Sequence, residues 1–383
     1  MRETNQNQKQ PITSQTGFSL VELMVGLVIG LLATLVIMQI FSAFEGQKRT
    51  TSGNSDAQTS GSVGLYSLQR DTQLAGFGLP LYDAANMPLN CTVTPTVDHD
   101  GDGGALTAPI SMSPIDITDG VTATDSDSVT IRYGTSASGG VPVPVVGAPA
   151  LLVATVNNNM ACFDDDVVYV VTGNTCAATR VNDNSLDPVA TPVRTNFTTI
   201  TLTTMPASVA DQTSLSCLTR WNQITYQVDT SVANNPQLTR LDTFNNITPT
   251  AVVPGVVNIQ AQYGISATPN SNQITQWVNA TGIWATAALT QANRNRIKAV
   301  RVAIIARNGL LEKLPAVSAA CSSTATANPT GVCAWDATSA NPINASPAPG
   351  VDLSNTANWN QYRYKVYETI IPLRNMVWTR ARL

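Results

Sequence analysis

The chain has 383 residues, which is enough for one large domain or two ordinary ones. Only 12% of its residues are charged, about half of the usual share of roughly a quarter, and the net charge is −4. This acidic balance argues against a protein that binds nucleic acid through a basic surface. The single histidine, His99, leaves little basis for a histidine-dependent catalytic triad or a histidine-rich zinc site.

The N-terminal region joins a polar segment to a long apolar one. Residues 1–17 are polar and slightly basic, and residues 18–44 are apolar with one charge, Glu22. As a helix, the apolar segment would be about 40 Å long, and the hydrocarbon core of a bilayer is about 30 Å thick. An ordinary secretory signal places its small cleavage-site residue after the apolar segment, whereas Gly17 stands before it. The sequence therefore predicts a membrane-spanning helix.

Glu22 is the unusual residue of this helix, because a carboxylate inside an apolar segment normally has a partner. Cleavage after Gly17 would create a positively charged amine at Phe18, one helical turn from Glu22. Glu22 could then pair with that amine or with the amine of a neighbouring subunit. The alternative is an ordinary signal anchor that tolerates one glutamate near the membrane interface.

Residues 17–22, with the sequence GFSLVE, stand directly before the apolar helix. This arrangement resembles the class III leader of type IV pilins and pseudopilins. The resemblance implies that prepilin peptidase cuts after Gly17 and N-methylates Phe18. It also implies that Glu22 satisfies the N-terminal amine of an adjacent subunit when the helices stack into a filament core.

Residues 45–78 are predicted to continue the helix as an amphipathic segment. A narrow apolar stripe follows three- and four-residue spacing at Leu65, Leu68, Thr72 and Ala75. Glycine costs up to about 1 kcal/mol in a helix, so the segment is expected to be bendable or partly unwound at its glycines: Gly46, Gly53, Gly61 and Gly64. Residues 68–78, LQRDTQLAGFG, resemble the RD-x-x-x-AG-aromatic helix exit of the PilW family of minor pilins.

Residues 79–383 are predicted to form a β-rich globular head. Short runs between Gly, Pro, Asn and Asp turns indicate strands at 128–133, 151–155, 167–172, 198–204, 224–228, 237–242, 256–265, 299–306 and 364–372. Strict alternation over 257–263 predicts a half-buried strand with one face in solvent. The connections at 80–127, 135–150 and 315–360 lack periodicity, which favours a core sheet with large insertions over two separate domains.

Three segments of the head also resemble the PilW family: residues 127–134 (DSVTIRYG), 253–264 (VPGVVNIQAQYG) and 371–375 (IPLRN). Together with the leader, they imply an α+β, pilin-like lollipop fold. In that fold a long N-terminal hydrophobic helix, residues 18–78, forms a spine that packs on a large antiparallel β-rich head, residues 79–383.

The six cysteines include no C-x-x-C pair, which speaks against zinc and thioredoxin-like sites: Cys91, Cys162, Cys176, Cys217, Cys321 and Cys333. An even number of spaced cysteines favours disulfides in an oxidising compartment over reduced thiols in the cytosol. Proximity in the chain favours Cys162–Cys176 and Cys321–Cys333, which leaves Cys91–Cys217 as a long-range bridge. Six cysteines allow 15 connectivities, so other pairings stay open.

Residues 98–103 match the first half of an EF-hand-like loop, because Asp98, Asp100 and Asp102 alternate before a glycine. The twelfth position is Pro109 and not the usual bidentate glutamate, so the set of ligands is incomplete. The alternatives are a solvated Asp-Gly turn and a weak Ca²⁺ site. No other cofactor is predicted.

Two further groups of charged residues lie next to predicted strands. The aspartates are interpreted as turn initiators and charged edge residues and not as catalytic pairs: Asp125, Asp127, Asp164, Asp165 and Asp166. The second group is a basic run, interpreted as a solvated strand face or as a contact for an acidic neighbour in a filament: Arg294, Arg296, Lys298 and Arg301.

The family resemblance implies a structural minor pilin of a type IV pilus and not an enzyme, in keeping with the lack of any recognisable catalytic or nucleotide-binding motif. The helix would cross the inner membrane once, with the head in the periplasm. After cleavage and methylation, the chain would pack with other minor pilins and the major pilin to prime assembly at or near the pilus tip. The implied partners are prepilin peptidase and a tip adhesin, with roles in twitching motility and cell adhesion and no nucleic acid.

Two alternatives remain open from the sequence. The first is a GspJ-like pseudopilin of a type II secretion system. The second is a membrane-anchored periplasmic binding or enzymatic domain, which would keep its N-terminal methionine or show no processing.

Overall fold

The computed structural model describes residues 17–79, 111, 113–122, 125–136, 139, 141–159, 162–164, 166–172, 175–182, 198–231, 235–244, 246–312, 331–334, 350–354 and 358–378. The chain forms two compact units, Met1–Ser52 and Gly53–Leu383. Helix α1 (Leu20–Gln73) belongs with its first part to the N-terminal unit and with its last part to the head unit.

In the N-terminal unit, α1 is long and apolar enough to cross a membrane, with a mean hydropathy of 2.6 over its most apolar window. The helix begins directly after Ser19, whose carbonyl oxygen accepts hydrogen bonds from the backbone N–H groups of Glu22 (3.0 Å) and Leu23 (3.1 Å). The side chains of residues 18–44 are exposed, so this described part of the unit buries none of its apolar side chains.

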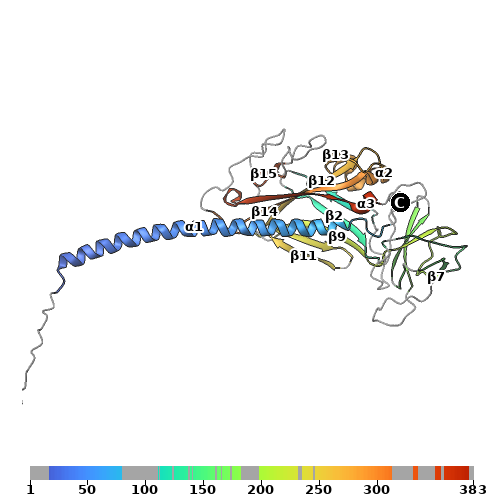
Figure 1. Ribbon diagram of the computed structural model, residues 1–383, viewed down its shortest axis with the longest axis horizontal. Coiled ribbons are helices and arrows are strands. Elements are labelled where there is room, and N and C mark those ends of the chain that lie inside the picture. The colour runs from blue at the N-terminus through green and yellow to red at the C-terminus, as the bar shows by residue number, and fades with distance from the viewer. Residues whose placement is uncertain are drawn as a thin grey trace, which may run out of the picture. The chain divides into compact units, whose positions relative to one another are not determined.

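The head unit is built on two antiparallel sheets (Figure 1). The first has the strand order β1-β2-β9-β10-β11: β1 (Ile115–Thr118), β2 (Ser128–Gly134), β9 (Trp221–Asp229), β10 (Gln237–Asp242) and β11 (Asn246–Pro254). The second has the order β13-β12-β14-β17: β12 (Val256–Ser266), β13 (Ile274–Val278), β14 (Ile297–Arg307) and β17 (Tyr364–Pro372).

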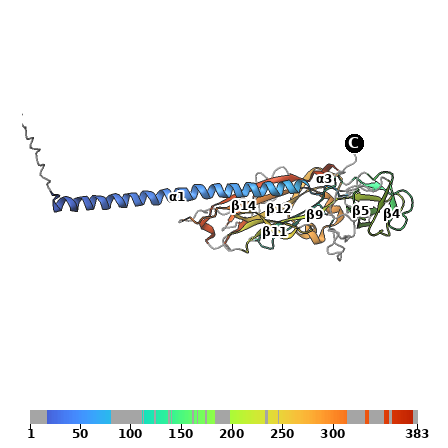
Figure 2. The same ribbon diagram turned by 90° about the horizontal axis from the view of Figure 1, so that it is seen from below.

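The main core lies where these two sheets meet the last part of α1. Buried apolar side chains from both sheets and from the helix form one cluster, which includes Leu68, Ile131, Ile224, Ile259 and Ile304. Burying large aliphatic side chains contributes roughly 1.5–3 kcal/mol each. This cluster therefore fixes the helix to the sheets, as Figures 1 and 2 show for the segment that runs along the head.

A second module is inserted between two neighbouring strands of the first sheet. Strands β2 and β9 pair directly, with Ile131 opposite Ile224, although residues 135–220 separate them in the chain. We call residues 135–220 the inserted module. It has its own apolar cluster and two small sheets, β3-β8-β5-β6 and β4-β7: β3 (Val143–Pro144), β4 (Val153–Thr155), β5 (Val167–Thr172), β6 (Thr175–Arg180), β7 (Thr199–Thr201) and β8 (Ser214–Cys217). Figures 1 and 2 both show it at one end of the head unit.

The remaining elements are short. They comprise the strand pair β15 (Gly331–Cys333) and β16 (Gly350–Asp352) and the helices α2 (Gln291–Arg296), α3 (Arg374–Trp378), η1 (Gly282–Trp284), η2 (Thr286–Ala288) and η3 (Trp359–Gln361).

The predicted fold class, a long apolar helix followed by an antiparallel β-rich head, is confirmed, and the strands at 237–242 and 364–372 have the predicted bounds. The prediction of one solvent-facing side for 257–263 is wrong. Strand β12 lies between β13 and β14, and Asn258 and Gln262 are buried. Their amide groups donate to the Asp125 carbonyl (3.2 Å) and the Asn279 side chain (2.7 Å), which compensates for burying polar side chains.

Candidate assembly site

The first part of the candidate site is the start of α1 in the N-terminal unit. Gly17 and Phe18 precede the first helical residue, Leu20, and the Phe18 side chain is 78% exposed. Glu22 lies in the first helical turn, where the partial positive charge of the helix N-terminus favours a carboxylate. The predicted cleavage bond is thus outside the helix, and Glu22 lies within one turn of the residue that would carry the new amine.

The rest of this segment carries no other charge, and its side chains are apolar apart from Ser19, Thr34, Gln39 and Ser42. After Glu22, the next charged residue is Glu45, which pairs with Arg49 on the helix surface at 3.3 Å. A helix that is apolar on all sides is stable only when lipid or other apolar helices surround it. Glu22 is therefore the single group on this segment that can form a directional ionic contact.

The second part of the site is the face by which α1 docks on the head. Its buried residues share one side of the helix and are mostly small: Gly53, Ala57, Ser60, Gly61, Gly64, Leu68, Asp71 and Thr72. A Cβ atom at Gly61 would overlap the ring of Tyr367 on β17, and one at Gly64 would lie 3.1 Å from Leu238 on β10. The absence of side chains at these two positions lets the helix approach both sheets closely.

The expectation of partial unwinding at the glycines is wrong, because α1 is continuous from Leu20 to Gln73. The loss of helix propensity at Gly61 and Gly64 is compensated by contact with the sheets. The predicted stripe is partly right: Leu68, Thr72 and Ala75 are buried, whereas Leu65 is only partly buried.

Asp71 is the charged anchor of the docked face. Its carboxylate accepts hydrogen bonds from the hydroxyl of Tyr226 on β9 (2.8 Å) and from Nε of Arg240 on β10 (2.9 Å). Burial together with the nearby Asp71 carboxylate raises the pKa of Tyr226, so the phenol stays protonated and donates. The sequence marks Asp71 within its RD-x-x-x-AG segment, but nothing in it points to Tyr226 and Arg240 as partners.

The chain leaves α1 through a turn that is tied to β2. Gly76 and Gly78 have φ angles of +78° and +76°, a region that glycine enters without steric cost. The Gly76 N–H donates to the Arg132 carbonyl (2.9 Å), and the Gly134 N–H donates to the Phe77 carbonyl (2.8 Å). The two segments 68–78 and 127–134 are thus neighbours in space.

The C-terminal segment closes the same turn. The Asn375 side-chain amide donates to the carbonyl oxygens of Ala75 (3.0 Å) and Leu74 (3.4 Å), just after the end of α1. Leu373 beside it is buried in the main core. The LRN sequence therefore contributes two contacts: the leucine packs in the main core, and the asparagine donates to carbonyls just after the end of the helix.

Asp127 joins the two main sheets. One carboxylate oxygen accepts from the Gly120 N–H (2.9 Å), the other accepts from the Ala261 N–H on β12 (2.7 Å), and its own N–H donates to the Ile259 carbonyl (2.9 Å). Burial raises the pKa of Asp127 to about 7, although both backbone bonds oppose that change. Its interpretation as an exposed edge residue is wrong, whereas Asp125 does stabilise a turn, through Thr122.

The predicted basic run is not a solvated strand face: Lys298 and Arg301 are buried on β14, whereas Arg294 and Arg296 are half-buried in α2. Arg301 on β14 contacts Glu368 on β17 at 3.4 Å, and the Lys298 amine donates to the Pro269 carbonyl at 3.1 Å. Burial lowers the pKa of Arg301, and Glu368 opposes this shift. Lys298 and Arg301 therefore belong to the interior of the head, because β14 is buried along its whole length.

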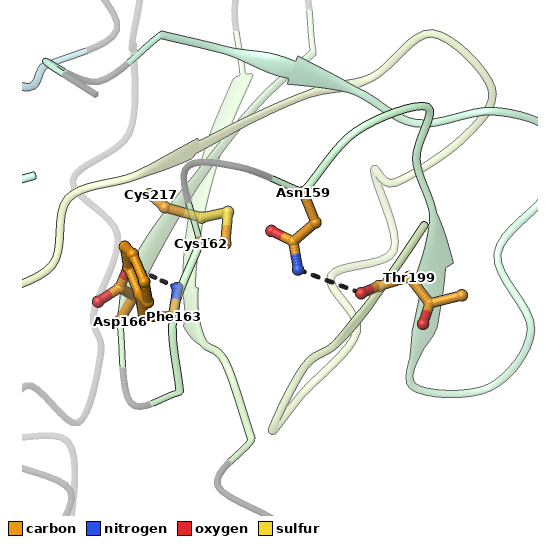
Figure 3. Close-up of a disulfide and its surroundings, with 6 residues drawn as sticks. All are labelled: Asn159, Cys162, Phe163, Asp166, Thr199 and Cys217. Atoms are coloured by element: carbon orange, nitrogen blue, oxygen red, sulfur yellow. Dashed lines mark hydrogen bonds between the residues drawn. A yellow bond between two sulfur atoms is a disulfide. The ribbon is translucent and has the colours of Figure 1, made fainter. Parts of the chain in front are cut away.

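The cysteines pair differently from the prediction. Cys162 bonds to Cys217, with their Cα atoms 5.2 Å apart (Figure 3). Cys176 is disulfide-bonded as well, so its partner is not Cys162, and a Cys91–Cys217 bond is excluded. The reason is orientation: Cys162 and Cys217 face the core of the inserted module, whereas Cys176 faces the main core.

The chain around this disulfide is ordered by short-range contacts that Figure 3 also shows. The Phe163 N–H donates to the Asp166 carboxylate (3.0 Å), and the Asn159 amide donates to the Thr199 carbonyl (3.3 Å).

Several predictions lie outside the described residues: the possible calcium ligands Asp98, Asp100 and Asp102, and the side chains of Cys91, Cys321 and Cys333.

Comparison with known families gives one match. Residues 225–375, which extend from β9 to α3, match the family model of type IV pilus-assembly protein W, PilW. No curated protein and no solved structure matches the chain. The matched region holds Tyr226, Arg240, Ala261 and Asn375, the residues that receive α1 and Asp127. The resemblance seen in the sequence is confirmed for this region, and the chain is consistent with a PilW-family pilin.

Proposed function

We propose that this chain is a structural minor pilin that primes assembly of a type IV pilus. In this proposal it is cleaved after Gly17, N-methylated at Phe18 and packed with other minor pilins at or near the filament tip. The match to PilW supports a role in pilus assembly. The observation that carries the finer proposal is the exposed, apolar segment 18–44 with Glu22 as its single charge.

Each half of α1 has a separate task in this proposal. The segment from Gly53 docks on the head through Asp71 and the small residues of its buried face. The segment 18–44 requires an apolar environment, first the inner membrane and later the helices of other pilins. Glu22 would pair with the N-terminal amine of a neighbouring subunit, and a misplaced subunit would leave that carboxylate buried and unpaired.

The proposal assigns the chain a mechanical role without catalysis. The contacts of Asp71, Asp127 and Asn375 hold elements of the fold together, and all three side chains are engaged in structural hydrogen bonds. The partners would be prepilin peptidase during maturation, then other minor pilins, the major pilin and a tip adhesin.

The N-terminus of the mature protein tests the maturation step. Mass spectrometry of the full chain purified from cells that make pili should find an N-methylated phenylalanine, Phe18, as the first residue. Retention of Met1, or a first residue other than Phe18, would contradict the proposal. Loss of surface pili on deletion of the chain, with protein secretion unchanged, is expected for a pilin and not for a secretion pseudopilin.

The assembly step is tested by Glu22→Ala in the full chain. We expect normal amounts in the membrane fraction and at least a tenfold loss from sheared pili, because the amine of the neighbour loses its partner. Glu45→Ala is the matched control, since Glu45 pairs with Arg49 on the exposed surface of the same helix. Equal incorporation of Glu22→Ala and Glu45→Ala would refute the role of Glu22.

A further inference from the structure

One end of the head unit is formed by two segments, one directly after β14 and one that leads through η3 into β17. They comprise residues 308–312 and 358–365, and we call them together the basal surface. The Asn308 N–H donates to the Arg363 carbonyl (3.0 Å), so the two segments are joined through their backbones.

The basal surface lies against the first residue of the head unit, Gly53 of α1. A Cβ atom at Gly53 would be 2.8 Å from Nδ2 of Asn308, so this side chain packs on the bare backbone of the helix. Nδ2 of Asn308 donates to the Leu310 carbonyl (2.7 Å), and its Oδ1 accepts from the Arg363 N–H (2.9 Å). The basal surface is therefore fixed to the end of the docked helix that leads back to residues 18–44.

Aliphatic, aromatic and basic side chains are exposed together on this surface. Leu310 and Leu311 are 48% and 40% exposed, the ring of Trp359 is only partly buried, and Lys365 is exposed. Leucine beside tryptophan and a cation is the combination found where proteins meet the interface between lipid and water.

The charge of the basal surface favours an anionic partner. Its charged residues are Glu312, Arg363 and Lys365, two cations against one carboxylate. Glu312 is neutralised by Arg363 through two contacts, Nε to Oε1 at 2.5 Å and Nη2 to Oε2 at 3.1 Å. A cation close to anionic lipid headgroups contributes about 1 kcal/mol to membrane binding.

The segment that can cross a membrane is close to this surface along the chain. Gly53 follows Phe44, the last residue of the apolar segment, by nine residues, and α1 is helical throughout this stretch. The nine residues span about 14 Å of helix. The apolar segment is about 10 Å longer than the hydrocarbon core, and a helix that is too long is accommodated by tilting, up to about 40°. This tilt leaves Gly53 about 10 Å beyond the hydrocarbon, next to a headgroup layer about 5–8 Å thick.

We propose that the basal surface rests on the headgroup layer of the membrane that α1 crosses, with Leu310 and Leu311 at the interface and Lys365 near lipid phosphates. This inference rests on the membrane anchoring within the proposed function. A bilayer is favoured over another protein because the membrane-crossing segment is only nine residues away. The contact would hold the head on the membrane before assembly and would have to break when the subunit enters a filament.

Photo-crosslinking of the full chain in vesicles of phosphatidylcholine and phosphatidylglycerol tests the contact. With p-benzoylphenylalanine in place of Leu311, irradiation should yield a phospholipid adduct that mass spectrometry detects. The yield should be at least fivefold higher than with the same residue in place of Leu151. Equal yields from the two positions, or an adduct of position 311 with a second copy, would overturn the proposal.

Leu151 is the matched control because it is a leucine, 93% exposed, in the inserted module. This module begins directly after Gly134, whose N–H donates to the carbonyl of Phe77 beyond the end of α1 (2.8 Å). Gly53 lies twenty residues before the last helical residue, Gln73, which is about 30 Å of helix. The two leucines therefore belong to opposite ends of the head.

A third position, Phe41, separates this inference from the proposed function. Phe41 lies within the apolar segment and is 74% exposed, so p-benzoylphenylalanine there should also yield a lipid adduct. An adduct at Phe41 without one at Leu311 would overturn only the contact of the basal surface. The lack of an adduct at Phe41 would show that α1 is not in the bilayer, which would refute membrane anchoring and the proposals that depend on it.

The variant Leu310→Asp tests the leucines themselves. With the crosslinking residue at position 311, this variant should lower the lipid adduct at least threefold, because a carboxylate is repelled by anionic headgroups. Leu151→Asp should leave the yield unchanged. Both leucines are exposed, so the thermal midpoint should stay within about 2 °C of the parent protein in each case. An unchanged yield in a folded Leu310→Asp variant would contradict the proposal.

Discussion

The main core and the inserted module of the head differ in where they place their polar and apolar side chains. In the main core, polar side chains such as Asp71, Asp127 and Asn375 are directed inward and join distant segments of the chain. In the inserted module, a compact aliphatic cluster is closed by the Cys162–Cys217 disulfide, and its leucines at 151 and 152 point outward. The polar contacts of the first region hold distant segments of the head together, whereas the second region exposes apolar side chains to solvent.

The boundary between these two regions lies close to the start of the family match. The match to PilW begins at residue 225, immediately after the inserted module, and covers the strands that receive α1. The partners of Asp71, which are Tyr226 and Arg240, thus lie within the matched region, whereas β2, which holds the end of the helix, and the inserted module lie outside it. We infer that the main core and the inserted module are separable in folding, and the following variants test that separation.

The largest effect is expected from removing the disulfide of the inserted module. In the chain-entropy model, a bond that closes a loop of 55 residues stabilises the fold by about 4 kcal/mol. The double variant Cys162→Ala, Cys217→Ala should therefore lose hydrogen-exchange protection in β5 and β8 while the last turns of α1 keep theirs. An equal loss of protection in both regions would show that the two cores unfold together.

A pH-dependent effect is expected in the main core. Because burial raises the pKa of Asp127 to about 7 from an unfolded value of 3.8, ionisation favours the unfolded chain between these values. The free energy of unfolding should fall by about 2.5 kcal/mol from pH 5 to pH 8. Chemical denaturation of the full chain at both pH values measures this change.

The variant Asp127→Asn should abolish this pH dependence, because the amide does not titrate. Asp125→Asn is the control, since Asp125 forms an exposed turn contact with Thr122. If Asp127→Asn keeps the slope of the parent protein, another group is responsible, and Asp127 does not act as a titrating contact between the sheets.

The smallest of the three effects concerns the docked helix. Gly61→Ala should destabilise the head by about 2 kcal/mol, because the new methyl group overlaps the ring of Tyr367. Gly46→Ala, at a position with no neighbour within 4 Å, should be neutral or stabilise the helix by about 0.5–1 kcal/mol. Thermal unfolding in detergent compares them, and the same sign for both would contradict close docking at Gly61.

The sequence was informative where one local pattern determines the structure. Unbroken hydrophobicity predicts the apolar part of α1, and runs of β-branched residues between turn residues predict β10 and β17 with the observed bounds. The helix exit at Gly76 and Gly78 was also predictable, because few residues other than glycine adopt the required φ angles.

The sequence was misleading where a structural feature depends on contacts with residues that are distant in the chain. Helix propensity describes how much Gly61 destabilises α1 as an isolated helix. It does not reveal that the ring of Tyr367 packs directly on the backbone at Gly61 and compensates for this loss. Spacing along the chain favoured Cys162–Cys176, although the pleat of the strands directs these side chains to different cores. Arg301 and Asp127 read as surface charges because nothing local reveals that another layer of chain covers them.

The contact between Asn375 and the end of α1 has a consequence for biosynthesis. The amide and the carbonyl of Ala75 are 300 residues apart in the chain, so this hydrogen bond forms only after the whole intervening chain has been synthesised. The apolar helix, in contrast, leaves the ribosome long before Asn375. A product that ends before Asn375 would therefore carry the apolar helix while the carbonyl of Ala75 lacked the side-chain amide that binds it in the complete fold.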